Sequence, residues 1–147
     1  MRKAEVGRSA LPRAIHTMLK YLEKHKIIPL IVTILLAIEI FYFSSLSSLP
    51  GSPIRDLNLA IVYHIIVFFL FAFFLLITIK GNAKLKPKHL FWVLIITIFY
   101  AISDEFHQLF VPGRSPAIKD ILIDLIGILL AVLIYPKKSD TKKAKSQ

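Results

Sequence analysis

The chain contains no cysteine. That absence excludes disulfide bonds, a thiolate nucleophile and any metal site built from cysteine ligands. The apolar segments also lack an alternation of period two, so neither soluble strands nor a transmembrane β-barrel is predicted. No segment of the sequence repeats another. These absences favour a single all-α unit without a disulfide framework.

Acidic residues are scarce as well. Asp and Glu number 9 against 19 Lys and Arg, which gives a net charge of +10. Such a charge can indicate nucleic-acid binding. Here, however, the basic residues lie at the two ends of the chain and in one short segment between apolar runs, as in membrane proteins, whose Lys and Arg set orientation. We therefore predict membrane lipids as partners, and no nucleic acid.

Apolar residues dominate what is present. Of 147 residues, enough for one domain, 56% are hydrophobic and 11 are phenylalanine. Four segments approach the roughly 20 apolar residues that cross a bilayer: residues 27–43, 58–79, 90–109 and 116–135. The sequence thus predicts an all-α integral membrane protein with four transmembrane helices. Its membrane domain covers residues 27–135, between a basic N-terminal segment, 1–26, and a basic tail, 136–147.

The distribution of Lys and Arg predicts the orientation. These residues are concentrated in the N-terminal segment, in the loop between the second and third spans, and in the C-terminal tail. Basic loops stay on the cytoplasmic side of a membrane. Both termini are therefore predicted in the cytoplasm, and the first and third loops face outward.

The N-terminal segment contains a helical pattern. An apolar series at Leu11, Ile15, Met18, Leu19 and Leu22 is opposed by Arg13, Lys20 and Lys24. This pattern predicts an amphipathic helix on an anionic membrane surface. A solvated helix or a frayed tail is the alternative. A signal peptide is disfavoured, because the segment before the first apolar run is long and charged.

One densely polar passage, residues 103–116, lies between apolar segments. By the helix rise of about 1.5 Å per residue, ionisable groups of four different helices fall in the outer half of the membrane: Glu39, His64, Asp104, Glu105, Asp120 and Asp124. Ionisable groups inside a membrane are costly, which makes a cluster of them a candidate functional site. The agreement in depth predicts one polar chamber that opens outward.

Spacing within the helices supports this chamber. Asp120 and Asp124 are four residues apart and share a helix face, so their repulsion must be relieved by a cation, a proton or Arg114. Asp104 and Glu105 are adjacent and about 100° apart, so both are expected to reach one point only if the helix unwinds. A divalent cation held by Asp104, Asp120 and Asp124 is one hypothesis.

The turn after the third span has its own signals. Val111-Pro112-Gly113-Arg114 predicts a type II turn, with glycine at a positive φ. Ser115 and Pro116 then predict a helix start, as N-cap and first helical residue. This geometry predicts Arg114 above the helix N-terminus near Asp120, as an anion site.

These residues carry a family resemblance. The pattern S-D-E-x-H-Q-L-F-V-P-G-R at 103–114, followed by Asp120, Asp124 and Gly127, resembles the signature of VanZ-like membrane proteins. His64, Ser44 and Ser45 also match polar positions of that family. The chain departs at Leu46, where many members carry Gln-Pro after the serines. The resemblance implies a multi-pass protein of the bacterial plasma membrane, and its namesake is associated with resistance to teicoplanin.

Three functions remain open. The first is recognition, with or without modification, of a lipid-linked or amphipathic envelope ligand. The second is an intramembrane hydrolase or transferase, and the third is a proton-coupled carrier. Whether the protein is an enzyme, and its oligomeric state, are left open. Candidate catalytic residues are Asp104, Glu105, His64 and Asp124, and candidate ligand-binding residues are Arg114, Gln108, Asp120, His107 and Glu39. The structural alternative is an ion-pair network that only joins helices.

Overall fold

The computed structural model describes residues 13–47 and 57–135. Within these ranges the chain is helical and contains no strand. The helices are α1 (Arg13–Lys24), α2 (Ile27–Ser45), α3 (Leu57–Lys80), α4 (Pro87–Gln108) and α5 (Ile118–Ile134). The all-α prediction is confirmed. The predictions made for residues 1–12, for the first loop at 48–56 and for the tail at 136–147 lie outside the described residues.

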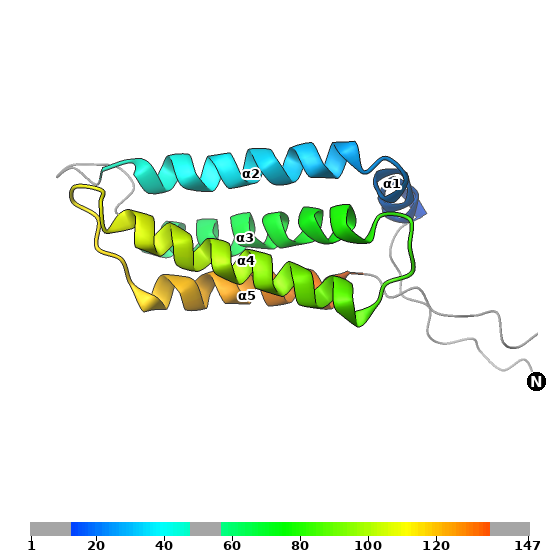
Figure 1. Ribbon diagram of the computed structural model, residues 1–147. Helices are drawn as coiled ribbons and strands as arrows, with labels where there is room; N and C mark the ends of the chain where they lie inside the picture. Colours follow the sequence, from blue (N-terminus) through cyan, green and yellow to red (C-terminus); the bar gives the residue numbers. More distant parts are fainter. Residues whose placement is uncertain (1–12, 48–56, 136–147) are drawn as a thin grey trace, which may run out of the picture.

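Four of the helices run along one another as a bundle, and α1 lies across one end of it (Figure 1). Helix α3 is central, since it contacts each of the other four. Consecutive bundle helices run in opposite directions (Figure 1). The C-terminal ends of α2 and α4 therefore meet the N-terminal ends of α3 and α5, and this common end carries most of the residues predicted as a site.

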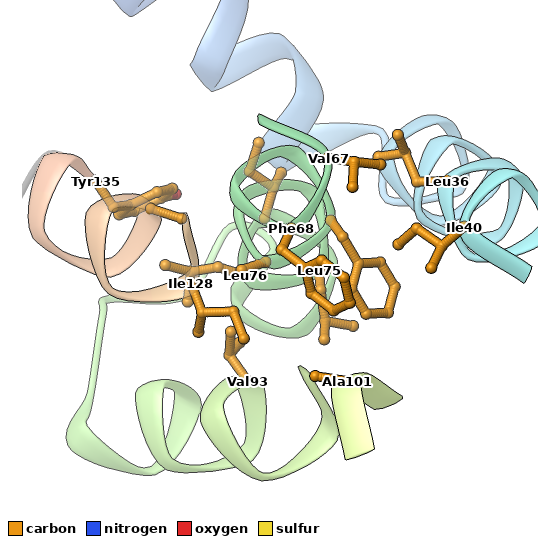
Figure 2. Close-up of a cluster of buried hydrophobic side chains, with 14 of the residues drawn as sticks. Leu36, Ile40, Val67, Phe68, Leu75, Leu76, Val93, Ala101, Ile128 and Tyr135 are labelled. Carbon is orange, nitrogen blue, oxygen red and sulfur yellow. The ribbon is translucent and has the colours of Figure 1, made fainter. Parts of the chain in front are cut away.

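The core is formed around α3. Phe68, Leu75 and Leu76 of this helix lie between side chains of the other three bundle helices (Figure 2). Those partners include Leu36 and Ile40 of α2, Val93 and Ala101 of α4, and Ile128 of α5. Phe68, Leu76, Val93 and Ile128 are all fully buried. Part of the phenylalanine-rich half of α3 therefore belongs to the core.

The outer faces of the bundle are apolar. Large hydrophobic side chains are exposed along α2, α4 and α5, as expected where lipid replaces water as solvent. Among the described residues, α2, α3 and α4 are long and apolar enough to cross a membrane. Helix α5 has 17 residues and is the shortest of the bundle. Its role as a fourth span, like the cytoplasmic termini, stays a prediction.

Two predicted helix starts are corrected. Helix α4 begins at Pro87 rather than Leu90, because proline suits the first helical position and the Lys86 amide donates to His89 Nδ1 at 3.1 Å. Helix α5 begins at Ile118, and Ala117 is its N-cap in place of Ser115. The reason is tertiary: the Ala117 amide donates to Glu105 Oε2 of α4 at 2.7 Å, so a distant carboxylate does the work predicted for a local serine.

The predicted helix at the N-terminus is confirmed as α1, with a modified apolar face. Leu19 is buried against the bundle and Leu22 is partly buried, whereas Ile15 and Met18 are exposed. The inward side also carries Glu23, which the apolar series did not include. Of the four described residues of the stripe, two therefore pack on the bundle and two are exposed.

Gly127 sets the distance between α3 and α5. A Cβ atom at this position would lie 2.4 Å from the Ile65 carbonyl oxygen and 3.0 Å from the Phe69 nitrogen. Both are backbone atoms, so relief requires the helices to separate. We expect Gly127→Ala to lower the free energy of unfolding by about 1–3 kcal/mol, as overpacked cores do. Thermal unfolding in detergent measures this, with the exposed Ile126→Ala as control. Equal melting temperatures for Gly127→Ala and wild type would contradict it.

Candidate functional site

The common end of α2, α3, α4 and α5 brings predicted residues together. Gln108 lies at its centre: its Nε2 donates to Asp104 Oδ2 at 3.2 Å and to Glu105 Oε1 at 3.1 Å. All three residues are buried. The expectation that two adjacent carboxylates cannot reach one point without unwinding is therefore wrong. Helix α4 is continuous from Pro87 to Gln108. Both carboxylates still reach one point, because their side chains bend toward the Gln108 amide about one turn away.

His64 of α3 pairs with Asp124 of α5. Its Nδ1 lies 2.8 Å from Asp124 Oδ1, and the Asp124 side chain is completely buried. When Asp124 is ionised its carboxylate can only accept, so Nδ1 then carries the proton of this hydrogen bond and Nε2 lies outside the pair. The imidazole of His64 therefore relieves the charge repulsion expected between Asp120 and Asp124. Asp120, one turn earlier, is only partly buried.

Arg114 points to a different helix from the one predicted. Its Nε donates to the Leu46 carbonyl at 3.0 Å, and its Nη2 donates to the Phe43 carbonyl at 2.8 Å. These carbonyls lie at the C-terminal end of α2, where a cation complements the helix dipole. The prediction of an arginine over the start of α5 beside Asp120 is therefore wrong. The turn itself is confirmed: Gly113 has φ 79° and the Arg114 amide bonds to the Val111 carbonyl at 3.1 Å.

The remaining predicted residues lie at the margin. His107 Nε2 is 2.9 Å from the Ser45 hydroxyl, which also donates to the Phe41 carbonyl at 2.7 Å, so this pair joins α4 to α2. Glu39 is exposed on α2 and makes no hydrogen bond or ion pair within the described part of the chain. Glu39 thus lies outside the hydrogen-bonded groups at this end of the bundle.

A cavity of about 340 Å³ opens at this end, between α2, α3 and α4. Its walls are mostly apolar, and its polar groups come from α2, α3, α4 and the turn after α4. The lining residues are Ile40, Phe43, Ser44, Leu59, Ala60, Tyr63, His64, Val67, Phe68, Asp104, Gln108 and Arg114. Of the predicted site residues, His64, Asp104, Gln108 and Arg114 line the cavity, and Asp124 holds His64 from behind. Glu105, Asp120, His107 and Glu39 do not line it.

Unpaired polar atoms gather here. In the described part of the chain, the buried side-chain atoms without a hydrogen-bond partner are Ser44 Oγ, Tyr63 Oη, Asp104 Oδ1 and Asp124 Oδ2. Three of these residues line the cavity, and the fourth contacts a lining histidine. Folded proteins satisfy nearly all buried polar groups, so an unpaired cluster in one place requires an explanation. A polar ligand that completes the bonds is one.

The structure bears on the metal hypothesis. Among the described residues, no group of three or more His, Cys, Asp or Glu side chains is arranged to hold a metal ion. Asp124 is hydrogen-bonded to His64, and Asp104 is hydrogen-bonded to Gln108. The three aspartates proposed as cation ligands therefore do not converge on one point.

Sequence reasoning missed two features of the site. Tyr63 was not among the predicted site residues, and Ser44 was named only as a polar position of the family pattern. Both line the cavity with unpaired hydroxyls. The available signal was spacing: Tyr63 adjoins His64, and Ser44 lies four residues after Ile40, on the buried face of α2. Phe43 also contacts Tyr63 across the α2–α3 seam, with ring centroids 5.6 Å apart.

A second buried polar cluster lies at the opposite end of the bundle. Glu23 of α1 is 2.8 Å from Lys80 Nζ and accepts a hydrogen bond from Tyr135 Oη at 2.6 Å. Lys80 also donates to the Gly81 carbonyl at 3.1 Å and lies over the Tyr135 ring. The polar groups of this second cluster are paired with one another, unlike those at the cavity. This cluster fixes α1 to the ends of α3 and α5.

Comparison with known proteins agrees with the motif. The family model described as VanZ/LLP1 matches residues 13–139, most of the chain. Searches of curated proteins and of solved structures found no match. The match spans all five helices, the cavity and the polar turn. The chain belongs to the VanZ/LLP1 family.

Proposed function

We propose that this protein recognises an amphipathic or lipid-linked molecule of the bacterial cell envelope in the cavity between α2, α3 and α4. The observation that carries the proposal is the makeup of that cavity. Apolar walls from Phe43, Val67 and Phe68 suit a hydrocarbon chain, while unpaired hydroxyl and carboxylate oxygens suit a polar group. A ligand with both parts satisfies both surfaces.

The proposed setting is the plasma membrane, with α2 to α5 as four spans, both termini in the cytoplasm and the cavity near the outer surface. The charge pattern supports this orientation. The end with α1 carries Lys80, Lys84, Lys86 and Lys88, from the last residue of α3 to the first turn of α4. The cavity end, in its described residues, carries Arg114 and Lys119. Basic segments remain inside. Reporter fusions at Pro112 test the orientation directly.

A role in tolerance of teicoplanin-type glycopeptides is the biological part of the proposal. It rests on membership of the family and on an envelope ligand at an outward site. The two other functions are outcomes of the same work. A hydrolase or transferase would use His64 Nε2, oriented by Asp124, and would consume the bound molecule. A carrier would need proton movement through the same carboxylates.

Arg114 offers a first test. We expect Arg114→Ala to reduce retention of co-purified amphiphile by about tenfold, because it removes two charge-assisted hydrogen bonds that hold the end of α2 at the cavity wall. Native mass spectrometry of the purified full-length protein measures the bound fraction. Lys119→Ala removes an exposed cation at the same end and serves as control. Equal retention in wild type and Arg114→Ala would contradict the proposal.

A further inference from the structure

Several hydrogen-bond donors at the cavity are committed to the protein. The Gln108 amide nitrogen donates to two carboxylates, and the Nε and Nη2 of Arg114 donate to two backbone carbonyls of α2. His64 Nδ1 is bonded to Asp124. The N–H groups that these bonds leave over belong to a guanidinium that already caps α2, so an anionic headgroup would have to share it.

The acceptors differ. Neither Asp104 Oδ1 nor the Ser44 hydroxyl beside it bonds to any other group in the described part of the chain, and both residues are 6% exposed. The third such oxygen of the lining is Tyr63 Oη. Charge points the same way. Asp104 is the carboxylate that lines the cavity, and a buried negative charge is stabilised by a cation far better than by a second anion.

We propose that the ligand presents a primary ammonium group to Asp104. This inference rests on the proposed function and names the chemistry of its ligand. A primary ammonium has three N–H donors, and three oxygens of the lining, on Asp104, Ser44 and Tyr63, are bonded to no other part of the described chain. The Tyr63 ring adds an aromatic face beside the cation. The amine belongs to an amphiphile, because the rest of the wall is apolar.

The apolar part of the ligand lies toward the seam between α2 and α3. On its other side, α2 is joined to α4 by two contacts. The Tyr100 hydroxyl donates to the Ala37 carbonyl at 2.5 Å, and the Ser45 hydroxyl contacts His107 Nε2. At the α3 side the cavity is bordered by Phe43 and Leu59, which are 37% and 60% exposed. A hydrocarbon chain can thus extend from the cavity to the lipid-facing surface along this seam.

The test compares three twelve-carbon amphiphiles on the delipidated full-length protein in nonionic detergent, by native mass spectrometry titration. Dodecylamine supplies charge and donors, dodecyltrimethylammonium supplies charge without N–H donors, and dodecyl phosphate is anionic. We expect dodecylamine to bind at least about tenfold more tightly than either of the others, since hydrogen bonds to a charged group are worth about 1.5–3 kcal/mol. Asp104→Asn should weaken dodecylamine binding by about 10- to 100-fold on the same basis.

Two variants keep the test decisive. Ser44→Ala removes one proposed acceptor without a charge change, and we expect about fivefold weaker dodecylamine binding. Asp120→Asn removes a carboxylate at the same bundle end that does not line the cavity, and should leave the affinity unchanged. Tighter binding of dodecyl phosphate, or unchanged dodecylamine affinity in both Asp104→Asn and Ser44→Ala, would overturn the ammonium assignment while leaving an amphiphile site intact. Absence of binding by all three probes would overturn the proposed function as well.

Discussion

Filling the cavity should abolish ligand binding with little loss of folding stability. Ala60 lines the cavity near the N-terminal end of α3 and is only partly buried. In Ala60→Trp the indole ring takes up space inside a cavity of about 340 Å³ that the native chain leaves open. We expect the fraction of protein that retains amphiphile to fall by at least about tenfold, because the apolar contacts of the ligand are replaced by those of the ring.

We expect Ala60→Trp to lose ligand binding while it keeps most of its folding stability. Overpacking of a closed core costs about 1–3 kcal/mol, and an open cavity should stay at the low end of that range. Native mass spectrometry gives the retained fraction, and thermal unfolding in the same detergent gives the stability. Leu129→Trp introduces the same ring on the exposed face of α5 and is the matched control. If Ala60→Trp retained amphiphile like wild type, the cavity could not be the binding site.

Breaking the His64–Asp124 pair should destabilise the protein strongly. In His64→Leu the carboxylate of Asp124, which is completely buried, loses the imidazole 2.8 Å away. Removing one member of a buried pair costs about 3–5 kcal/mol, because a charge is left uncompensated. We expect a clearly lower melting temperature and reduced abundance in the membrane.

The double variant His64→Leu/Asp124→Leu decides what the pair is for. Replacing both members by apolar residues removes the stranded charge, so most of the lost stability should return. If the pair only joins α3 to α5, this variant should also retain ligand and glycopeptide tolerance at wild-type levels. We expect it to be folded but to lose both, because His64 lines the cavity. Normal tolerance in the folded double variant would support the purely structural alternative.

The helices were largely predictable from the sequence. Apolar runs of 17 to 22 residues leave no other regular structure for this chain, since a lipid-facing backbone must satisfy its own hydrogen bonds. The predicted starts of α4 and α5 were wrong by two or three residues. At α5 the cause was an incoming carboxylate, Glu105, that serves as the local cap. A pattern read over neighbouring residues cannot include a partner that folding supplies from another helix.

The site was predictable as a location more than as a set of contacts. His64, Asp104, Gln108 and Asp124 were selected because ionisable and amide groups are costly among apolar residues, and they do meet at one end of the bundle. The direction of Arg114 was not predictable. Its turn geometry was correct, but the choice between the start of α5 and the end of α2 depends on how the helices pack.

The sequence by itself determined that this protein is helical, apolar on its outer faces and polar at the end where α4 leads into α5, because a lipid-facing helix bundle tolerates few other patterns. The tertiary structure alone decided which polar atoms are paired. Hydrogen bonds form over about 3 Å, a distance that the packing of α2 against α3 and α4 sets and that helix periodicity does not. That packing leaves the oxygens of Ser44, Tyr63 and Asp104 unpaired around one cavity.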